Sequence, residues 1–321
     1  MRETLTIFRA LADPTRLRIV ALLRVMELSV GELAQVLGQS QPRVSRHVKI
    51  LADAGLAERR REGSWVFLAL GEARRTAPMF AAIDVWSGDA GGATASDLAR
   101  LDAVRAERSA AAERYFEGHA AEWDAIRSLH VAEAEVEQAI AAALGEGSLG
   151  RLVDIGTGTG RMLELLGPRA QSAIGIDRSP EMLRFARARL AVAGRHDPAI
   201  ARAELRQGDM YALPLPDRSA DVVMLHQVLH YAQQPAAAVS EAARLLGAGG
   251  RLLIADFAPH DREELRDGAA HMRLGFSDQQ MFDWFGAAGL EPKRADALAG
   301  GELTVKLWLG ERPAESVRRV A

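Results

Sequence analysis

The residues with the most specific chemistry form a glycine-rich stretch near the middle of the chain. Glycine occupies every second position at Gly156, Gly158 and Gly160, and Asp154 stands just before the first of them. Glycines allow sharp turns and a close approach of the backbone to a ligand, and the helix that follows such a loop offers unpaired N–H groups. A second acid, Asp177, comes roughly 20 residues later, where a carboxylate can accept both hydroxyls of a ribose. The pattern therefore indicates a nucleoside-binding loop.

The elements that would position these residues belong to an α/β sheet. Residues 151–155 form an apolar run that predicts a strand, and residues 161–166 have a helical pattern after the glycines. Residues 173–177 predict the next strand, so this segment forms the first unit of a nucleotide-binding sheet. The dinucleotide pattern G-x-G-x-x-G is not met, because Arg161 stands where its last glycine would be. The alternative is a glycine-rich turn that holds no ligand.

This stretch resembles the cofactor loop of the class I S-adenosylmethionine-dependent methyltransferases, and the resemblance covers about residues 112–312. It implies a Rossmann-like α/β domain with a seven-stranded sheet that binds S-adenosylmethionine or S-adenosylhomocysteine. Asp154 would help to fix the amino-acid end of the cofactor, Asp209 would accept from the adenine amino group, and Met210 would cover the ring. The cofactor-binding residues implied in this way are Asp154, Gly156, Thr157, Gly158, Gly160, Asp177, Arg178, Met182, Gly208, Asp209, Met210, His226, Gln227 and Tyr115.

Further apolar runs predict the rest of the sheet, in an alternation of strands and helices that closes with a hairpin. The expected strands cover residues 203–209, 221–225, 251–256, 290–293 and 303–308, and the expected helices cover residues 131–144, a segment capped by Ser179, and residues 278–288.

The sequence assigns no catalytic residue. Methyl transfer needs an acceptor aligned behind the sulfonium, sometimes with a base that removes its proton. Side chains that could be this base lie at or after the expected strand ends, where open α/β sheets bind ligands: His226, His230, Tyr231, Asp256 and His260. Each could equally be a cofactor contact or a structural side chain. Residues 257–260 and 271–276 are expected to form a lid over the substrate mouth.

The front of the chain combines helical patterns with a local excess of cations. Residues 1–72 predict four helices and a hairpin, the order of a winged helix-turn-helix that is mainly α with a β-hairpin wing. Asp13, Ser29 and Ser40 are expected to cap the second, third and fourth helices, with Glu32 completing a capping box at Ser29. The fourth helix was expected to bury one side that ends at Leu56. The net charge of the chain is only −3, so nucleic acid would have to bind a local basic patch.

A recognition helix places its first residues on base edges in the major groove. Gln41 can pair with adenine, and Arg43 or Arg46 can pair with guanine. Phosphate contacts from Lys49 and the wing would make the affinity sensitive to salt. The expected DNA-binding residues are Ser40, Gln41, Arg43, Ser45, Arg46, His47, Lys49, Arg60, Arg61 and Ser64. The alternative is a winged helix used only for packing or dimerisation.

The sequence segments at residues 10–19, 27–33 and 40–47 resemble the corresponding segments of the ArsR/SmtB family of bacterial repressors. Metal-sensing members of that family have two cysteines in the second of these segments, where this chain has Ser29 and Gly31. The chain has no Cys at all, so a thiolate site for arsenic or cadmium is impossible, and we expect no regulatory metal. The signal must therefore come from elsewhere in the chain.

The middle, residues 73–130, is expected to hold a linker over residues 88–96 and a long helix over residues 97–119. This helix could pair two subunits through an apolar stripe of Leu98, Leu101, Val104 and Ala111, or it could only bridge two domains. The end of this helix and the residues after it resemble the segment of methyltransferases that folds over the cofactor. The residues that carry this resemblance are Tyr115, Phe116, His119 and Trp123. Residues 131–321 would then form the nucleoside-binding domain.

Two functions follow from these motifs. The first is a DNA-binding regulator that senses S-adenosylhomocysteine or S-adenosylmethionine, as the resemblance to S-adenosylhomocysteine-responsive ArsR-type regulators of the methionine cycle implies; it would bind a palindromic operator as a homodimer. The second is an active methyltransferase of a small molecule with an attached DNA-binding domain. Methylation of nucleic acid or protein is a third, since folds alone do not decide function. No apolar run reaches about 18 residues, and the N-terminus lacks a signal pattern, so we expect a cytoplasmic protein.

Overall fold

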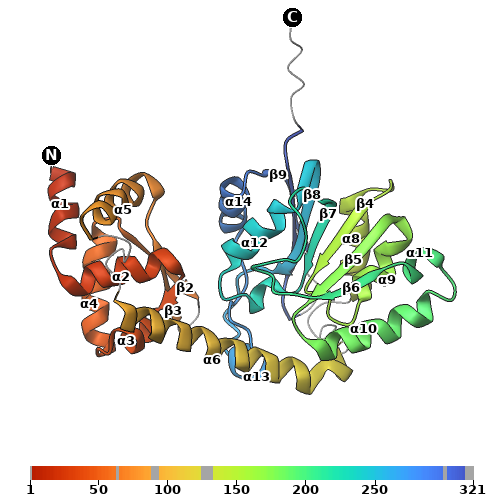
Figure 1. Cartoon of the computed structure of the whole chain (residues 1–321), viewed down its shortest axis with the longest axis horizontal. Helices are drawn as coiled ribbons and strands as arrows, with labels where there is room; N and C mark the ends of the chain where they lie inside the picture. The colour runs from red at the N-terminus through yellow and green to blue at the C-terminus, as the bar shows by residue number, and fades with distance from the viewer. Residues whose placement is uncertain (1, 63–64, 88–93, 124–132, 299–301, 315–321) are drawn as a thin grey trace, which may run out of the picture. The chain divides into compact units, whose positions relative to one another are not determined.

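A computed structural model describes residues 2–62, 65–87, 94–123, 133–298 and 302–314. The chain forms two compact units, Met1–Ala111 and Ala112–Ala321, whose elements are labelled in Figure 1. Each unit has its own hydrophobic core. Among the described helices, none is both long enough and apolar enough to cross a membrane.

The N-terminal unit is a helical domain with a small antiparallel sheet of strand order β1-β3-β2. The winged helix-turn-helix fold predicted for the front of the chain is confirmed. Its helices are α1 (Arg2–Leu11), α2 (Pro14–Val25), α3 (Val30–Leu37), α4 (Gln41–Asp53), α5 (Ala73–Ser87) and α6 (Ala95–His119), the last of which continues into the second unit. Its strands are β1 (Leu28–Ser29), β2 (Ala57–Glu62) and β3 (Trp65–Leu70).

The helix starts follow the expected caps at two of three positions. The side chain of Asp13 accepts from the Arg16 N–H, and Ser29 and Glu32 form a complete capping box. Ser40 stands at the N-cap of α4, but its side chain makes no capping hydrogen bond, so that part of the prediction was wrong. The buried side of α4 ends at Leu51, because the helix stops at Asp53 and Leu56 lies beyond it.

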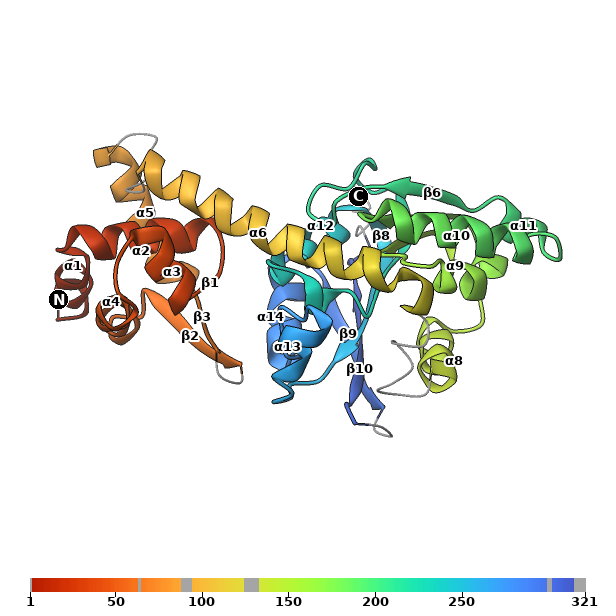
Figure 2. The same ribbon diagram turned by 90° about the horizontal axis from the view of Figure 1, so that it is seen from below.

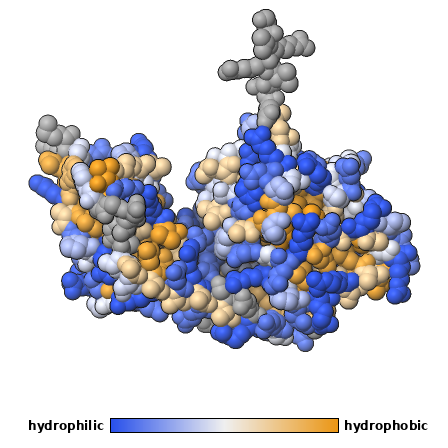
Figure 3. Space-filling model, viewed as in Figure 1, coloured by the Kyte–Doolittle hydropathy of each residue, from blue (hydrophilic) through white to orange (hydrophobic). Residues whose placement is uncertain are grey.

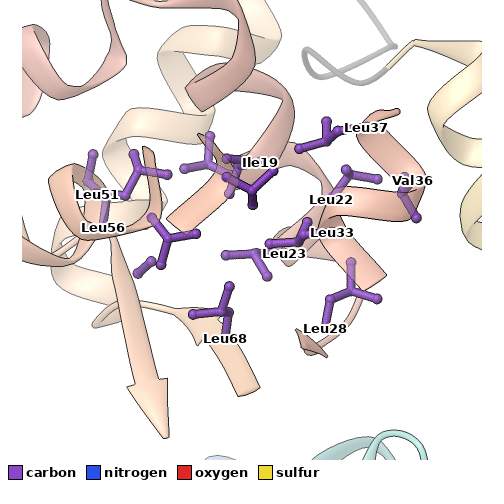
Figure 4. Packing of buried hydrophobic residues seen from close by; sticks show 14 of the residues in the cluster. Ile19, Leu22, Leu23, Leu28, Leu33, Val36, Leu37, Leu51, Leu56 and Leu68 are labelled. Carbon is purple, nitrogen blue, oxygen red and sulfur yellow. The ribbon is translucent and has the colours of Figure 1, made fainter. Parts of the chain in front are cut away.

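The core of this unit reaches beyond the winged helix itself. Leucine, isoleucine and valine side chains of α2, α3, α4 and the hairpin pack together in the centre (Figure 4). Met79, Phe80 and Ile83 of α5 join this core, and so do Leu101 and Val104 of α6. The apolar stripe expected on the long helix is therefore divided, since Leu101 and Val104 are buried within the unit while Leu98 is exposed.

The C-terminal unit contains a seven-stranded sheet of order β6-β5-β4-β7-β8-β10-β9, as predicted. The strands are β4 (Gly150–Ile155), β5 (Ala170–Asp177), β6 (Glu204–Gln207), β7 (Ala220–His226), β8 (Leu246–Phe257), β9 (Glu291–Leu298) and β10 (Val305–Glu311). The helices are α8 (Glu133–Leu144), α9 (Arg161–Leu166), α10 (Pro180–Ala193), α11 (Pro198–Ala201), α12 (Pro235–Arg244), α13 (Glu264–Ala269) and α14 (Asp278–Ala287), with 3-10 turns η2 (Ala120–Glu122), η3 (Gly167–Arg169) and η4 (Leu229–Tyr231).

Helices cover both faces of this sheet (Figures 1 and 2). Strand β7 shows why, because Val222 and Met224 pack against one cluster with α8 and α9, while Val223 and Leu225 pack against the other with α12 and α14. A strand buried on both faces is a continuous apolar run, which is the pattern of residues 222–225. The β5, β6, β7 and β8 pairings are parallel, and β10 is antiparallel to β8 and β9.

A buried ion pair ties α6 to α2 in the N-terminal unit. The Arg18 guanidinium donates to both carboxylate oxygens of Asp97, whose side chain is 0% exposed, with Nε 2.7 Å from Oδ2. Asp97 also accepts from the Thr94 N–H and caps the start of α6. The pair with Arg18 lowers the pKa of Asp97. Breaking such a pair from one side leaves a buried charge without its main partner.

We expect Arg18→Leu to lower the free energy of unfolding by about 2 kcal/mol, since the apolar stem is kept and the Asp97 carboxylate loses its cation. Arg24→Leu is the matched control, because the Arg24–Asp84 pair is exposed, at 45% and 42%, and such pairs contribute little. Urea unfolding of both variants of the full chain measures the difference. The contribution of Asp97 should be complete above its ordinary pKa of 3.8 and should disappear as the pH falls through its lower folded pKa. Equal losses in the two variants would contradict the assignment.

Candidate functional site

The carboxyl ends of the parallel strands bring the predicted nucleoside-binding residues to one edge of the sheet. Strand β4 ends just before the glycine loop, which we define as residues 156–160, and β5 ends at Asp177. Strand β6 is followed by Gly208 and Asp209, and β7 ends at His226. The strand order reverses beside β4, which lies between β5 and β7. Open α/β sheets bind ligands in the crevice at such a point.

The glycine loop adopts a backbone that its glycines make possible. The φ angles of Gly156, Gly158 and Gly160 are 71°, 53° and 81°, in the left-handed region that disfavours other residues. A Cβ on Gly156 would lie 2.4 Å from Cγ2 of Val228, so space as well as conformation requires glycine there. The Gly156 and Thr157 N–H groups donate to the Ile176 carbonyl at 2.7 and 3.0 Å. The loop is therefore fixed to the end of β5.

Two acids hold this loop from opposite sides. Asp154 is only 1% exposed, and its Oδ2 accepts from the Thr157 hydroxyl at 2.7 Å. The Asp177 carboxylate accepts from the Gly158 N–H and the Ser179 N–H, both at 2.8 Å. Burial raises the pKa of Asp177. Each carboxylate oxygen can accept more than one hydrogen bond, so the Asp177 carboxylate has capacity for the ribose hydroxyls as well.

The segment after β6 lies on the same edge. The Gly208 N–H donates to the Asp177 carbonyl at 3.0 Å, and Oδ1 of Asp209 accepts from the Tyr211 N–H at 3.0 Å. Asp209 and Met210 are half-buried, whereas Arg178 is exposed. Gly208 thus connects the expected ribose acid directly to the expected adenine side.

Strand β7 ends in a strained turn. Gln227 has a φ of 49°, one of three positive φ values at non-glycine residues in the described chain. Its N–H donates to the Ala255 carbonyl at 2.7 Å, and both His226 and Gln227 are buried. Backbone strain of this kind is held by surrounding structure and gathers at functional sites. This turn therefore marks the same edge of the sheet as the glycine loop.

A cluster of aromatic side chains lies beside the glycine loop, three of them from the segment that precedes β4 and one, Tyr231, from η4. We call Tyr115, Phe116, Trp123 and Tyr231 the aromatic layer. The Trp123 indole lies against Gly158, because a Cβ there would be 3.4 Å from its Nε1. Phe116 forms T-shaped pairs with Trp123 and Tyr231, with centroids 5.4 and 4.9 Å apart and planes at 72° and 79°. Met182 is buried beneath these rings.

The 3-10 turn η4 after β7 and the end of strand β8 supply a histidine–aspartate pair at the same edge. Nδ1 of His230 lies 2.8 Å from Oδ1 of Asp256, and the two side chains are 2% and 0% exposed. Asp256 also accepts from the N–H groups of Leu229, His230 and Phe257. Because a carboxylate surrounded by donors accepts here, Nδ1 of His230 carries the proton and Nε2 is the basic nitrogen. Nε2 is buried and has no hydrogen-bond partner among the described residues.

The other candidate bases are held differently. Burial raises the pKa of Tyr231 well above that of an exposed tyrosine, so its phenol stays protonated at neutral pH. Nδ1 of His260 accepts from the Arg262 N–H at 3.2 Å within its own loop. The expected lid segment around His271 is fixed, since the N–H groups of Met272 and Arg273 donate to the His230 carbonyl at 3.0 and 2.9 Å. The His271 ring lies 4.2 Å from that of His230.

The predicted DNA-binding residues lie mainly on the outside of the N-terminal unit. Those that are exposed are Ser40, Gln41, Arg43, Ser45, Arg46, Lys49 and Arg61. His47 instead lies 3.7 Å from the Asp13 carboxylate, and Arg60 lies 3.4 Å from Glu27, both half-buried. Ser64 falls outside the described residues. A groove of about 460 Å³ runs between α3, α4 and the hairpin, lined among others by Gln41, Ser45 and Arg59.

Comparisons with known proteins assign both units. A model of bacterial regulatory proteins of the arsR family matches residues 13–59, and a methyltransferase domain model matches residues 153–254. The chain joins an arsR-family regulatory domain to a methyltransferase domain. Within the described residues of both domains, no group of three or more His, Asp or Glu side chains could hold a metal.

Individual relatives match one domain or the other. The arsenic resistance transcriptional regulator ArsR1 of Pseudomonas putida is 47% identical over 74 residues, 22% of this chain and 58% of that protein. The uncharacterized methyltransferase YcgJ of Bacillus subtilis is 33% identical over 112 residues, 35% of this chain and 42% of that protein. This chain thus spans about half the length of these curated relatives. Among solved structures, a chain of the complex between the Haloferax volcanii Trm112 methyltransferase activator and a methyltransferase is 23% identical, with a TM-score of 0.53. The match covers 64% of this chain and 99% of that one. This likeness shows the fold of the methyltransferase domain.

The acids at this edge of the methyltransferase domain fit a nucleoside, because the carboxylates of Asp177 and Asp209 can accept from its hydroxyl and amino groups. Asp154, Asp177 and Asp209 lie at or just after the carboxyl ends of β4, β5 and β6, and Tyr115 packs against the cluster of Trp123 and Met182. The sequence did not reveal that His230 and Asp256 pair, or that Phe116, Trp123 and Tyr231 meet. Both groupings join segments far apart in the chain, and only the strand order brings them together.

We expect Gly156→Ala to destabilise the methyltransferase domain more than Gly145→Ala. Both glycines have a φ of 71°, so both variants carry the same backbone strain of about 1 kcal/mol. Only the Cβ at position 156 collides with Val228, while nothing lies within 4 Å of a Cβ at position 145. Urea unfolding gives the two losses of stability. Losses of equal size would show that the contact with Val228 does not constrain the loop.

Proposed function

We propose that this protein is a DNA-binding transcriptional regulator whose methyltransferase domain senses S-adenosylmethionine or S-adenosylhomocysteine. The observation that carries the proposal is the joining of an arsR-family domain, with no cysteine to bind a metal, to a domain with an ordered nucleoside loop. Ser29 occupies one of the positions where metal-sensing members have Cys, and it caps α3. The sensor role then falls to the glycine loop and Asp177. Genes of the methionine and S-adenosylmethionine cycle are the targets we propose.

The DNA side of the proposal rests on exposed polar and basic side chains of α4 and the hairpin. Gln41, Arg43 and Arg46 stand on the first turns of α4, where a recognition helix meets base edges. Lys49 and Arg61 are exposed and suited to phosphates. The cytoplasm is where we place such a regulator.

A homodimer on a palindromic operator is part of this proposal. Apolar side chains are exposed on two helices of the N-terminal unit, Leu5 and Phe8 on α1 and Val85 and Trp86 on α5, at 49%, 54%, 81% and 73%. Figure 3 shows apolar patches on the surface of this unit. Large exposed apolar side chains mark interaction surfaces. We assign the subunit contact to α1 and α5, because Leu101 and Val104 of α6 are already buried within the unit.

An effector changes DNA affinity only if it binds the DNA-competent and DNA-incompetent forms differently. In fluorescence anisotropy with the chain's own upstream DNA, at one fixed salt concentration, we expect one of the two nucleosides to shift the binding midpoint by at least about 5-fold. Asp177→Ala should remove that shift and leave ligand-free DNA binding intact. Lys49→Ala should weaken DNA binding with or without nucleoside and lower the salt slope by about 1. If both nucleosides bind by calorimetry and neither moves the midpoint, the sensor proposal fails.

The His230–Asp256 pair favours a second candidate function, methyl transfer to a small acceptor. Asp256 fixes the tautomer of His230 and leaves Nε2 to take a proton. In that reaction the acceptor atom would form a bond to the methyl carbon as the carbon–sulfur bond breaks. The electron pair would go to sulfur, and the acceptor proton would go to Nε2 of His230.

This second function predicts acceptor-dependent transfer of labelled methyl from S-adenosylmethionine to a phenol, an amine or an alcohol, each of which carries a proton that the base can take. We expect His230→Gln to lower the transfer rate by roughly 100-fold or more, because a positioned base contributes about that much, while S-adenosylhomocysteine affinity is unchanged. Asp154→Ala should lose transfer together with binding. Absence of labelled product with all three acceptor classes would leave regulation as the sole function.

A further inference from the structure

The position of the sulfur atom in the bound nucleoside follows from its covalent structure, if the ligand is of the class proposed above. In S-adenosylmethionine and S-adenosylhomocysteine the sulfur joins the ribose to the amino-acid chain. Asp177 is placed for the ribose, and the glycine loop is placed for the amino-acid end. These two parts of the site meet at Gly158, whose N–H donates to Oδ2 of Asp177 at 2.8 Å. The sulfur therefore belongs beside Gly158.

The indole ring of Trp123 lies at this point, and two further aromatic rings pack on Trp123. Trp123 lies against Gly158, and its centroid is 6.1 Å from that of Tyr231 and 5.4 Å from that of Phe116. Burial raises the pKa of both Tyr115 and Tyr231, so the layer is uncharged at neutral pH. Uncharged aromatic faces attract a desolvated cation through their quadrupole, with Trp the strongest.

The nearby acids are arranged to favour positive charge as well. The Asp177 carboxylate accepts hydrogen bonds from backbone N–H groups, and the Asp256 carboxylate accepts from backbone N–H groups and from the His230 ring. These donors are dipoles and carry no full positive charge, so they leave the negative charge of each carboxylate in place. A sulfonium would therefore enter a region of aromatic faces and carboxylates. The neutral thioether of S-adenosylhomocysteine gains from neither.

We propose that the aromatic layer is a charge-specificity element that makes the sulfonium form, S-adenosylmethionine, the effector of this protein. Trp123 and Tyr231 supply the faces for the sulfonium, and Phe116 packs against both rings. The site then reports the methylated cofactor itself rather than its demethylated product. This inference rests on the proposed nucleoside site but requires no response of DNA binding.

Isothermal calorimetry on the full-length protein tests it with three ligands: S-adenosylmethionine, S-adenosylhomocysteine, and sinefungin, in which an ammonium-bearing carbon replaces the sulfonium. We expect the unaltered protein to bind the two cationic ligands more tightly than S-adenosylhomocysteine. Trp123→Leu should weaken the two cationic ligands by roughly 3- to 30-fold more than it weakens S-adenosylhomocysteine. Tyr231→Phe, which keeps the aromatic face, should retain the preference, and Tyr231→Leu should reduce it.

Phe185→Leu is the matched control, because Phe185 packs on the same cluster but its ring already has the Arg184 guanidinium 4.3 Å from its centroid. This variant should leave the ligand preference unchanged. Equal or tighter binding of S-adenosylhomocysteine by the unaltered protein overturns the inference without any variant. The inference can therefore be contradicted even if Trp123→Leu misfolds. Binding of none of the three ligands would overturn the nucleoside site and this inference together, whereas a lost preference alone leaves the regulator proposal standing.

Discussion

The hydrogen bond from the Gly158 N–H to the Asp177 carboxylate is the contact on which the proposed nucleoside site depends. It fixes the middle of the glycine loop to the end of β5, and the N–H groups of Gly156 and Thr157 add bonds to the Ile176 carbonyl. The loop can follow this path only with positive φ values at its glycines. Because Gly158 has no Cβ, the Trp123 indole can pack directly against its backbone. A shift of this one bond would move the ribose acid, the loop and the aromatic layer together.

The N-terminal unit separates charges that stabilise the fold from charges that remain at the surface. Arg18 pairs with the fully buried Asp97, and His47 and Arg60 lie beside Asp13 and Glu27. Arg43 and Lys49 are exposed on α4. The division matters because buried pairs are weakly screened by salt, while exposed cations interact with phosphates in a salt-dependent way. Salt can therefore modulate DNA binding without loosening the domain.

Local signals predicted most of the fold. The side-chain cap at Asp13, the capping box at Ser29 and the glycine loop each rely on residues within a few positions of one another, so the sequence alone reveals them. Helix α5, which contains Pro78, was not predicted, although its buried positions Thr76, Met79, Phe80 and Ile83 follow a helical period. Attention to that period would have found it.

Long-range groupings were beyond the sequence. His230 and Asp256 each looked like a lone candidate base, and their pairing depends on the relation between η4 and the end of the neighbouring strand β8. His47 was predicted to contact DNA because of its place on α4, but its side chain lies beside Asp13, the N-cap residue of α2. Sequence motifs show which residues are candidates for a site. The hydrogen bonds and ion pairs that each side chain makes with distant residues determine its role.

Helix α6 has a consequence for how such a protein can change over generations. It runs unbroken from Ala95 to His119, and the boundary between the two compact units falls inside it, after Ala111. Leu101 serves one core and Phe116 serves the other. A lineage that exchanged one unit for another would therefore have to keep the part of α6 that packs in the core of the remaining unit.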